Sequence, residues 1–180
     1  MQPRWKRAIL IIGVWCMTPA AVPLATAQTP QPTAVGHPTP PPMTREAMLA
    51  FLARPLVAHL ATVRPNGAPQ IFPMWFLWED GVLYMSTRTQ AAKLQHIRRN
   101  PRVAVVVDVM EAPLKNKVVT IAGTAEVLTT GVKEVTTKIY QKYMGAEAAA
   151  SAAAQQNINT PRVVLKITPK KIHTIDTTTR

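Results

Sequence analysis

The chain has 180 residues, 47% of them hydrophobic, a length that suits one domain with appendages and leaves little room for two. Its 21 Lys and Arg exceed its 9 Asp and Glu, and the formal net charge of +12 favours anionic partners, whether polymers or small molecules. The single cysteine, Cys16, falls in the apolar N-terminal segment, which excludes a disulfide framework and a Cys-based metal site from the folded part.

Common catalytic motifs are missing from the sequence. It contains no Walker-type phosphate loop, no dinucleotide-binding glycine motif and no nucleophile elbow. The four histidines are scattered and show no metal-binding spacing, so no metal site is expected.

The first 27 residues have the layout of a secretory signal peptide. A basic start is followed by an apolar stretch and by the small residues 25–27, which predicts cleavage before Gln28. Two alternatives stay open: the uncharged run 8–27 is retained as a membrane anchor, or translation starts at Met43. A genuine leader predicts a periplasmic or secreted protein, and a start at Met43 predicts a cytoplasmic one.

A proline-rich linker follows the leader. Residues 28–42 contain six prolines and no charge, a composition that favours extended polyproline II and cannot form a core. The folded domain is therefore predicted to span 43–180.

The domain begins with a helix and a hairpin. Thr44 is a suitable N-cap for a short amphipathic helix that ends before Pro55. Residues 57–63 read as a strand, and the turn 64–67 ends in Asn-Gly, the pair that most readily adopts a tight hairpin turn.

The second strand of this hairpin, 68–78, is unusual because it contains Pro69 and Pro73. A proline inside a strand indicates an edge, a bulge or a break in the ladder. Unpaired backbone beside a large apolar surface would suit a flat aromatic ligand. The alternative is an ordinary edge strand packed by its tryptophans.

Between Asp80 and Pro101 the sequence predicts a turn, a strand, a bend and a short helix. Asp80-Gly81 is a turn signal, and residues 82–85 have the composition of a strand. The bend 86–89 offers three hydroxyls and a guanidinium where a helix must begin, and Thr89 is the predicted N-cap.

Two cations, Arg88 and Lys93, stand at the predicted N-terminus of this helix. A cation there opposes the helix dipole, so a phosphate or carboxylate between the two would account for them. The alternative is that both are solvated surface charges, each destabilised by about 0.3 to 1 kcal/mol by the helix dipole. The residue types do not favour one interpretation over the other. Lys93 is expected to face solvent in the unliganded protein.

The C-terminal half adds strands and one clear helix. Residues 102–109 form a valine-rich strand apolar enough to be buried on both faces, and the loop 111–117 leads to a strand at 118–128. Gly123 within that strand marks a bulge or a close backbone approach.

An amphipathic helix is predicted at 132–144, followed by an alanine-rich segment, 146–154, that reads as a helical extension or a mobile stretch. Strands at 162–167 and, more weakly, 171–175 close the chain. About six strands joined mostly by hairpins, with helices at the edges, predict a mainly β antiparallel barrel.

Five stretches carry a family resemblance: LARPLVAHLATVRPNGAPQIFPMWF, EDGVLYMST, RRNPRVAVVV with Lys93 before it, VTIAGTAEV and RVVLKITPKKI. In their order and spacing over residues 43–176 they resemble the pyridoxamine 5'-phosphate oxidase-like flavin-binding split-barrel family, particularly its deazaflavin-dependent oxidoreductases. The resemblance implies a six-stranded antiparallel split β-barrel with short flanking helices. It also implies a homodimer with FMN or coenzyme F-420 in a groove between the two barrels.

The same resemblance assigns residues. Thr87 and Lys93 match the positions that hold the cofactor phosphate, with Ser86 and Arg88 as helpers. The positions that line the isoalloxazine ring are matched by Pro73, Met74, Trp75 and Phe76. The segment 68–78 lacks the arginine of members that oxidise pyridoxamine phosphate, so vitamin B6 oxidation is not implied, and FMN and F-420 both stay open.

The expected function is a flavin- or deazaflavin-dependent oxidoreductase acting on a small organic substrate. The cofactor supplies the redox chemistry, which accounts for a sequence without an acid, base or nucleophile constellation. The alternative is a protein of the same fold that binds a flavin or another planar anion without turnover. Nucleic-acid binding is not expected, because the basic residues are dispersed and no motif arranges aromatics and arginines for base stacking.

Overall fold

The computed structural model describes residues 40–113 and 115–178, and all of them belong to one unit, Pro38–Arg180. The predicted signal peptide and most of the predicted linker lie outside the described residues. Within the described ranges, no helix is long and apolar enough to cross a membrane.

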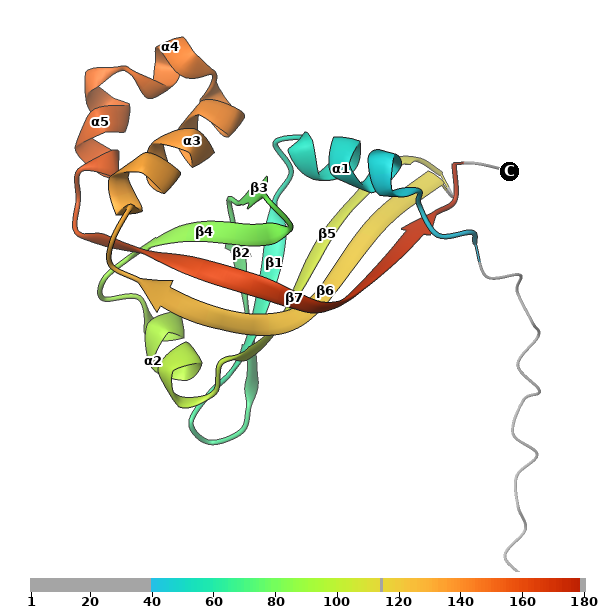
Figure 1. The fold of residues 1–180 in the computed structure, drawn as a ribbon, viewed down its shortest axis with the longest axis horizontal. Helices are drawn as coiled ribbons and strands as arrows, with labels where there is room; N and C mark the ends of the chain where they lie inside the picture. The colour runs from blue at the N-terminus through green and yellow to red at the C-terminus, as the bar shows by residue number, and fades with distance from the viewer. Residues whose placement is uncertain (1–39, 114, 179–180) are drawn as a thin grey trace, which may run out of the picture. The chain divides into compact units, whose positions relative to one another are not determined.

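Seven strands form one antiparallel sheet in the order β2-β1-β5-β6-β7-β4-β3 (Figure 1). The mainly β antiparallel fold that we expected is confirmed, with seven strands in place of six. The strands are β1 Ala58–Val63, β2 Pro69–Met74, β3 Leu77–Glu79, β4 Val82–Arg88, β5 Arg102–Ala112, β6 Lys115–Leu128 and β7 Arg162–Asp176.

The proline-containing segment 68–78 breaks into β2 and β3, which lie at the two opposite edges of the sheet. The two residues between them, Trp75 and Phe76, carry the chain from one edge to the other. As expected for prolines in a strand, Pro69 and Pro73 lie in an edge strand. On the open side of such a strand no neighbour accepts hydrogen bonds, so a residue without an N–H is tolerated there.

Two boundaries differ from the predictions because cross-strand pairing is longer than local composition indicates. The expected loop 111–117 is mostly strand, since β5 and β6 pair as far as Ala112 and Lys115. The two strands expected at 162–167 and 171–175 are one, because β7 pairs with β6 along nearly its whole length.

Gly123 marks the one shift in the β6–β7 register, between Ala122 and Gly123. A Cβ atom at this position would lie 2.4 Å from the carbonyl oxygen of Thr168. The predicted close approach is therefore confirmed, and any side chain here would collide with backbone.

In the part of the chain that the structure describes, five helices flank the sheet (Figure 1). Thr44 caps the first as predicted, accepting a hydrogen bond from the Ala47 N–H at 3.1 Å. The alanine-rich segment forms two short helices, divided at Ser151, whose hydroxyl caps the second. The helices are α1 Arg45–Ala53, α2 Ala92–Arg99, α3 Val132–Met144, α4 Ala146–Ala149 and α5 Ala152–Ile158.

The core occupies one face of the curved sheet. In β5 the side chains of Val103, Val105 and Val107 are buried, whereas Val106 is half-buried and Asp108 is exposed. The prediction that this strand is buried on both faces is therefore wrong for a single chain. Its outer face carries both apolar and charged side chains and is only partly covered.

Candidate anion-binding site

The end of β4 and the start of α2 enclose a hollow of about 390 Å³, which we call the bend pocket. This volume lies within the usual range for small-molecule sites. Its lining includes five of the residues predicted for the cofactor, and Pro73, Trp75 and Phe76 lie outside that lining. The bend pocket is lined by Met74, Ser86, Thr87, Arg88, Gln90, Ala91, Lys93 and Arg162.

The bend itself is held by two backbone hydrogen bonds. The Ala91 N–H donates to the Arg88 carbonyl at 3.1 Å, and the Thr89 N–H donates to the Pro161 carbonyl at 3.2 Å. Because this turn intervenes, α2 begins at Ala92 and its N-cap is Ala91, so the prediction that Thr89 caps the helix is wrong. No side chain of the described residues caps α2. The Leu94 N–H donates to the Ala91 carbonyl at 3.0 Å, which leaves the N–H groups of Ala92 and Lys93 without a hydrogen-bond partner among the described residues.

Lys93 is buried, with 9% of its surface exposed. The prediction that it faces solvent is wrong, because its ammonium lies 4.6 Å from the centroid of the Phe72 ring on β2. Its Nζ donates to the Thr87 hydroxyl at 3.3 Å, and no carboxylate among the described residues pairs with it. Burial lowers the pKa of Lys93. A buried cation without a counter-ion is costly, and an anion in the bend pocket would supply one.

The two hydroxyls of the bend differ in what they can donate. Thr136 donates its hydroxyl proton to the Val132 carbonyl at 2.6 Å, so Ser86 must be the donor in the 2.8 Å contact between Ser86 and Thr136. Ser86 therefore ties β4 to α3. The Thr87 hydroxyl accepts from Lys93 and finds no acceptor for its own proton among the described residues, so it is free to donate to a ligand.

Arg162 is a third cation of the bend pocket and was not predicted. It is paired with Arg88 across the β4–β7 ladder. Its Nε donates to the Asn157 carbonyl at 2.9 Å, which holds it beside the pocket. Only the β4–β7 register brings the two arginines together, and that register is not visible in local sequence.

The residues between β2 and β3 pack against α3. Trp75 stacks on the Tyr143 ring with centroids 4.6 Å apart, and Phe76 is fully buried. Lys142 lies 3.5 Å from the Phe76 ring centroid and donates to the Leu52 carbonyl at 2.8 Å. Burial lowers the pKa of Lys142 to about 8. These contacts fix the chain where it leaves the edge strand beside the bend pocket.

The Tyr143 hydroxyl bridges two backbone groups at this crossing. It donates to the Leu56 carbonyl and accepts from the Phe76 N–H at 3.1 Å. Burial raises the pKa of Tyr143 to about 12, so the phenol stays protonated and keeps both bonds across the neutral range. The hydroxyl thus joins α3 to the break between β2 and β3.

We expect Tyr143→Phe to lower the free energy of unfolding by about 1 kcal/mol, because two backbone groups lose a partner that water replaces only in part. Urea unfolding measures this loss. The control is Tyr140→Phe, whose hydroxyl has one hydrogen-bond partner within the described residues, Arg162 at 3.5 Å. Equal stabilities for the two variants would contradict the bridging role.

The model of the family described as pyridoxamine 5'-phosphate oxidase matches residues 44–176. The chain belongs to the pyridoxamine 5'-phosphate oxidase family. The match covers every element that forms the bend pocket. The predicted resemblance is therefore confirmed at the level of the family.

Solved structures agree with this family assignment. An F-420 reductase is 31% identical to this chain, with a TM-score of 0.56. The alignment covers 68% of this chain and 93% of the reductase. A conserved hypothetical protein from Mycobacterium tuberculosis shares the fold with a TM-score of 0.67 at 23% identity, covering 76% of this chain and 86% of the other. A FAD-binding protein from Mesorhizobium loti shares it with a TM-score of 0.53 at 21% identity, covering 74% and 93%. Comparison with curated proteins finds no match.

Proposed function

We propose that this chain binds a flavin-type cofactor, FMN or F-420, and acts as an oxidoreductase on a small organic substrate. The observation that carries the proposal is Lys93, a buried cation with no carboxylate partner among the described residues. It lies at an uncapped helix N-terminus beside the Thr87 hydroxyl. A cofactor phosphate would supply the missing charge.

Relatives support a cofactor of this type. The F-420 reductase and the FAD-binding protein share the fold of this chain, and the reductase is the more similar in sequence. Such a cofactor supplies hydride or electron transfer when bound, while the protein binds and orients it. The lining of the bend pocket, with hydroxyls and cations and no acidic side chain, fits binding and orientation.

The residues of the bend would hold the phosphate, and the end of the edge strand would face the ring. Thr87 and Lys93 are the principal phosphate partners, with Arg88 beside them and Ser86 supporting the bend. Met74 lines the bend pocket from the end of β2. We propose that Pro73 and Trp75 extend this wall along the ring, with Phe76 anchoring it from the core.

Reconstitution of the full chain with each cofactor tests the proposal. We expect FMN or F-420 to stay bound through gel filtration, with a shifted absorption spectrum, and the bound cofactor to be reduced anaerobically and reoxidised by an organic acceptor. Retention of cofactor without reoxidation would favour the non-catalytic binder. Retention of neither cofactor would overturn the proposal.

We also propose that the chain is a homodimer. The described residues expose large apolar side chains on the sheet and its edges, including Ile71, Met110 and Ile172 with 63%, 71% and 37% of their surfaces exposed. Together with the partly exposed outer face of β5, these would be covered by a second copy. Light scattering of the chain with cofactor bound is expected to give twice the chain mass, and a monomer mass would contradict this.

Cofactor affinity is expected to depend on pH through Lys93. The phosphate raises the pKa of Lys93 in the complex above its burial-lowered value in the free protein, so binding takes up a proton. The affinity for the cofactor is then constant at pH values below the pKa of Lys93 in the free protein. Between that pKa and the higher pKa of Lys93 in the complex, the affinity falls by up to tenfold per pH unit.

Titrations with FMN above roughly pH 8, where its phosphate monoester is already a dianion, measure this fall. Lys93→Met should lack the part of this fall that Lys93 causes. Lys142, whose pKa burial lowers to about 8, is present in both proteins, so the difference between the two profiles isolates Lys93. Parallel profiles would contradict the assignment.

A further inference from the structure

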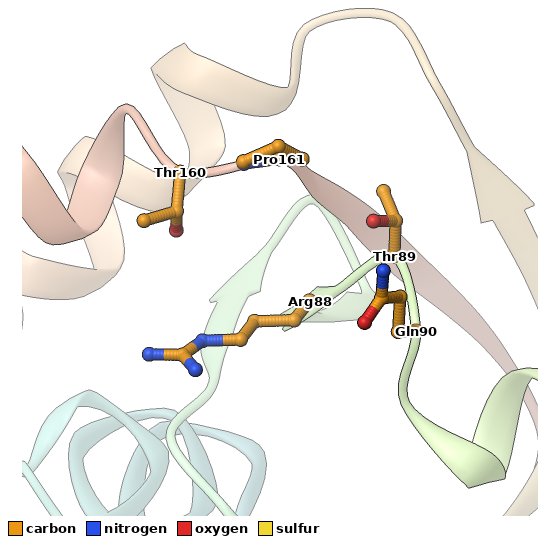
Figure 2. A pocket seen from close by; sticks show the side chains of 5 residues that line it. All are labelled: Arg88, Thr89, Gln90, Thr160 and Pro161. Carbon is orange, nitrogen blue, oxygen red and sulfur yellow. The ribbon is translucent and has the colours of Figure 1, made fainter.

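Lys142 on α3 is a titratable group that the proposed function does not use. As far as the structure describes their linings, Lys142 lines neither the bend pocket nor the smaller hollow beside it, which Figure 2 shows with the Arg88 side chain extended across it. The Lys142 side chain is half-buried, so one side of it stays open to solvent. Its chemistry is therefore set by its own neighbours.

Two electron-rich groups contact the Lys142 nitrogen. Its Nζ donates to the Leu52 carbonyl at 2.8 Å and lies 3.5 Å from the centroid of the Phe76 ring. The last turn of α1, which contains this carbonyl, has no basic residue, so Lys142 supplies the cation that favours a helix C-terminus. Within residues 40–113 and 115–178, no carboxylate pairs with Lys142.

The neutral form of this amine keeps its contacts and presents its lone pair to solvent. A primary amine donates N–H bonds to a carbonyl oxygen and to an aromatic ring face, and both of these groups repel a lone pair. The lone pair is thus left on the open side of the half-buried side chain. Because burial lowers the pKa of Lys142 to about 8, about a quarter of the amine is neutral at pH 7.5, against about 0.1% of an ordinary lysine.

Lys138, one turn earlier on α3, is the same residue type among acidic neighbours. Its Nζ lies 3.2 Å from a carboxylate oxygen of Glu79 and 3.2 Å from one of Glu134. The hydrogen bonds to Glu134 and then to Glu79 raise the pKa of Lys138. Its side chain is 39% exposed, so the more accessible of these two lysines is the one kept protonated.

We propose that Lys142 is an acylation site, which takes a small acyl group such as acetyl from an activated donor, either an acyl thioester or an acyl phosphate. The neutral nitrogen attacks the acyl carbon, a C–N amide bond forms, and the bond from that carbon to the thiolate or phosphate breaks. The leaving group takes up the proton that the nitrogen releases. The product is uncharged and keeps one N–H for the Leu52 carbonyl. A carbamate formed with CO2 would instead place a negative charge at the C-terminus of α1, where it is unfavourable.

The test incubates the full chain at pH 7.5 with acetyl phosphate or with acetyl-coenzyme A, a thioester, and measures acetylation of each lysine-containing peptide by mass spectrometry. Lys138 is the internal control. We expect Lys142 to be acetylated at least about tenfold faster than Lys138, because its larger neutral fraction outweighs its lower basicity and its burial. The donor that reacts faster identifies the source of the acyl group. Peptide mapping separates Lys142 from Lys93, whose pKa burial also lowers.

Two further measurements separate the folded environment from the local sequence. The rate at Lys142 should rise about tenfold per pH unit up to about pH 8 and level off above it, whereas the rate at Lys138 should keep rising. In the chain unfolded in urea both lysines have the ordinary pKa, so the two rates should become equal. Equal rates in the folded chain, or a faster Lys142 that persists after unfolding, would overturn the proposal.

Discussion

Lys93→Met is expected to weaken binding of FMN or F-420 by about 10- to 100-fold. A charge-assisted hydrogen bond to a phosphate contributes roughly 1.5 to 3 kcal/mol, and each 1.4 kcal/mol is a factor of ten in affinity. Methionine keeps the length of the stem against Phe72 and removes the charge. Fluorescence titration at pH 7 measures the loss.

The fold should survive this change and become no less stable. The free protein holds a buried ammonium whose one hydrogen-bond partner among the described residues is the Thr87 hydroxyl, and methionine removes the cost of burying that charge. The matched control is Arg99→Met, exposed and at the last position of the same helix. If the two variants bind cofactor equally, Lys93 is a buried structural cation and not a phosphate ligand.

Gly123→Ala is expected to lower the free energy of unfolding by about 3 kcal/mol, at the upper end of the usual cost of overpacking. The new Cβ would lie 2.4 Å from the Thr168 carbonyl oxygen, and a backbone atom cannot move aside as a flexible side chain can. Relief requires separating β6 from β7, the two longest strands of the sheet.

Urea unfolding measures the effect, with Ala122→Ser as the control at the exposed neighbouring position of the same strand. That control should change stability by less than about 0.5 kcal/mol. A Gly123→Ala variant as stable as the unmodified chain would show that the two strands separate at little cost.

Local chemistry predicted the parts of the fold whose causes are local. Thr44 caps its helix through a residue three positions away, and Gly67 and Gly81 take positive φ in the turns that their dipeptides indicate. A glycine inside a strand indicates a bulge or a close backbone approach, and Gly123 has both. The cap depends on a hydrogen bond within its own segment, and the two turns depend on a positive φ at their own glycines. At Gly123 the presence of glycine inside a strand was enough to predict the irregularity.

The sequence pointed to part of the lining of the bend pocket and not to its geometry. Ser86, Thr87, Arg88 and Lys93 do come together around one hollow. The burial of Lys93 depends on Phe72 in a different strand, and the pairing of Arg88 with Arg162 depends on a register between segments more than seventy residues apart. The start of α2 depends on Pro161 for the same reason. Contacts set by long-range packing leave no periodicity or turn signal in the local sequence.

A crystal structure of the full chain with FMN or F-420 bound tests the central claim most directly, because that claim is a position for the cofactor phosphate. We predict phosphate oxygens about 3 Å from the Lys93 ammonium and the Thr87 hydroxyl, the distance of an ordinary hydrogen bond. A bound cofactor whose phosphate lies outside the bend pocket, with Lys93 still donating only to Thr87, would contradict that position.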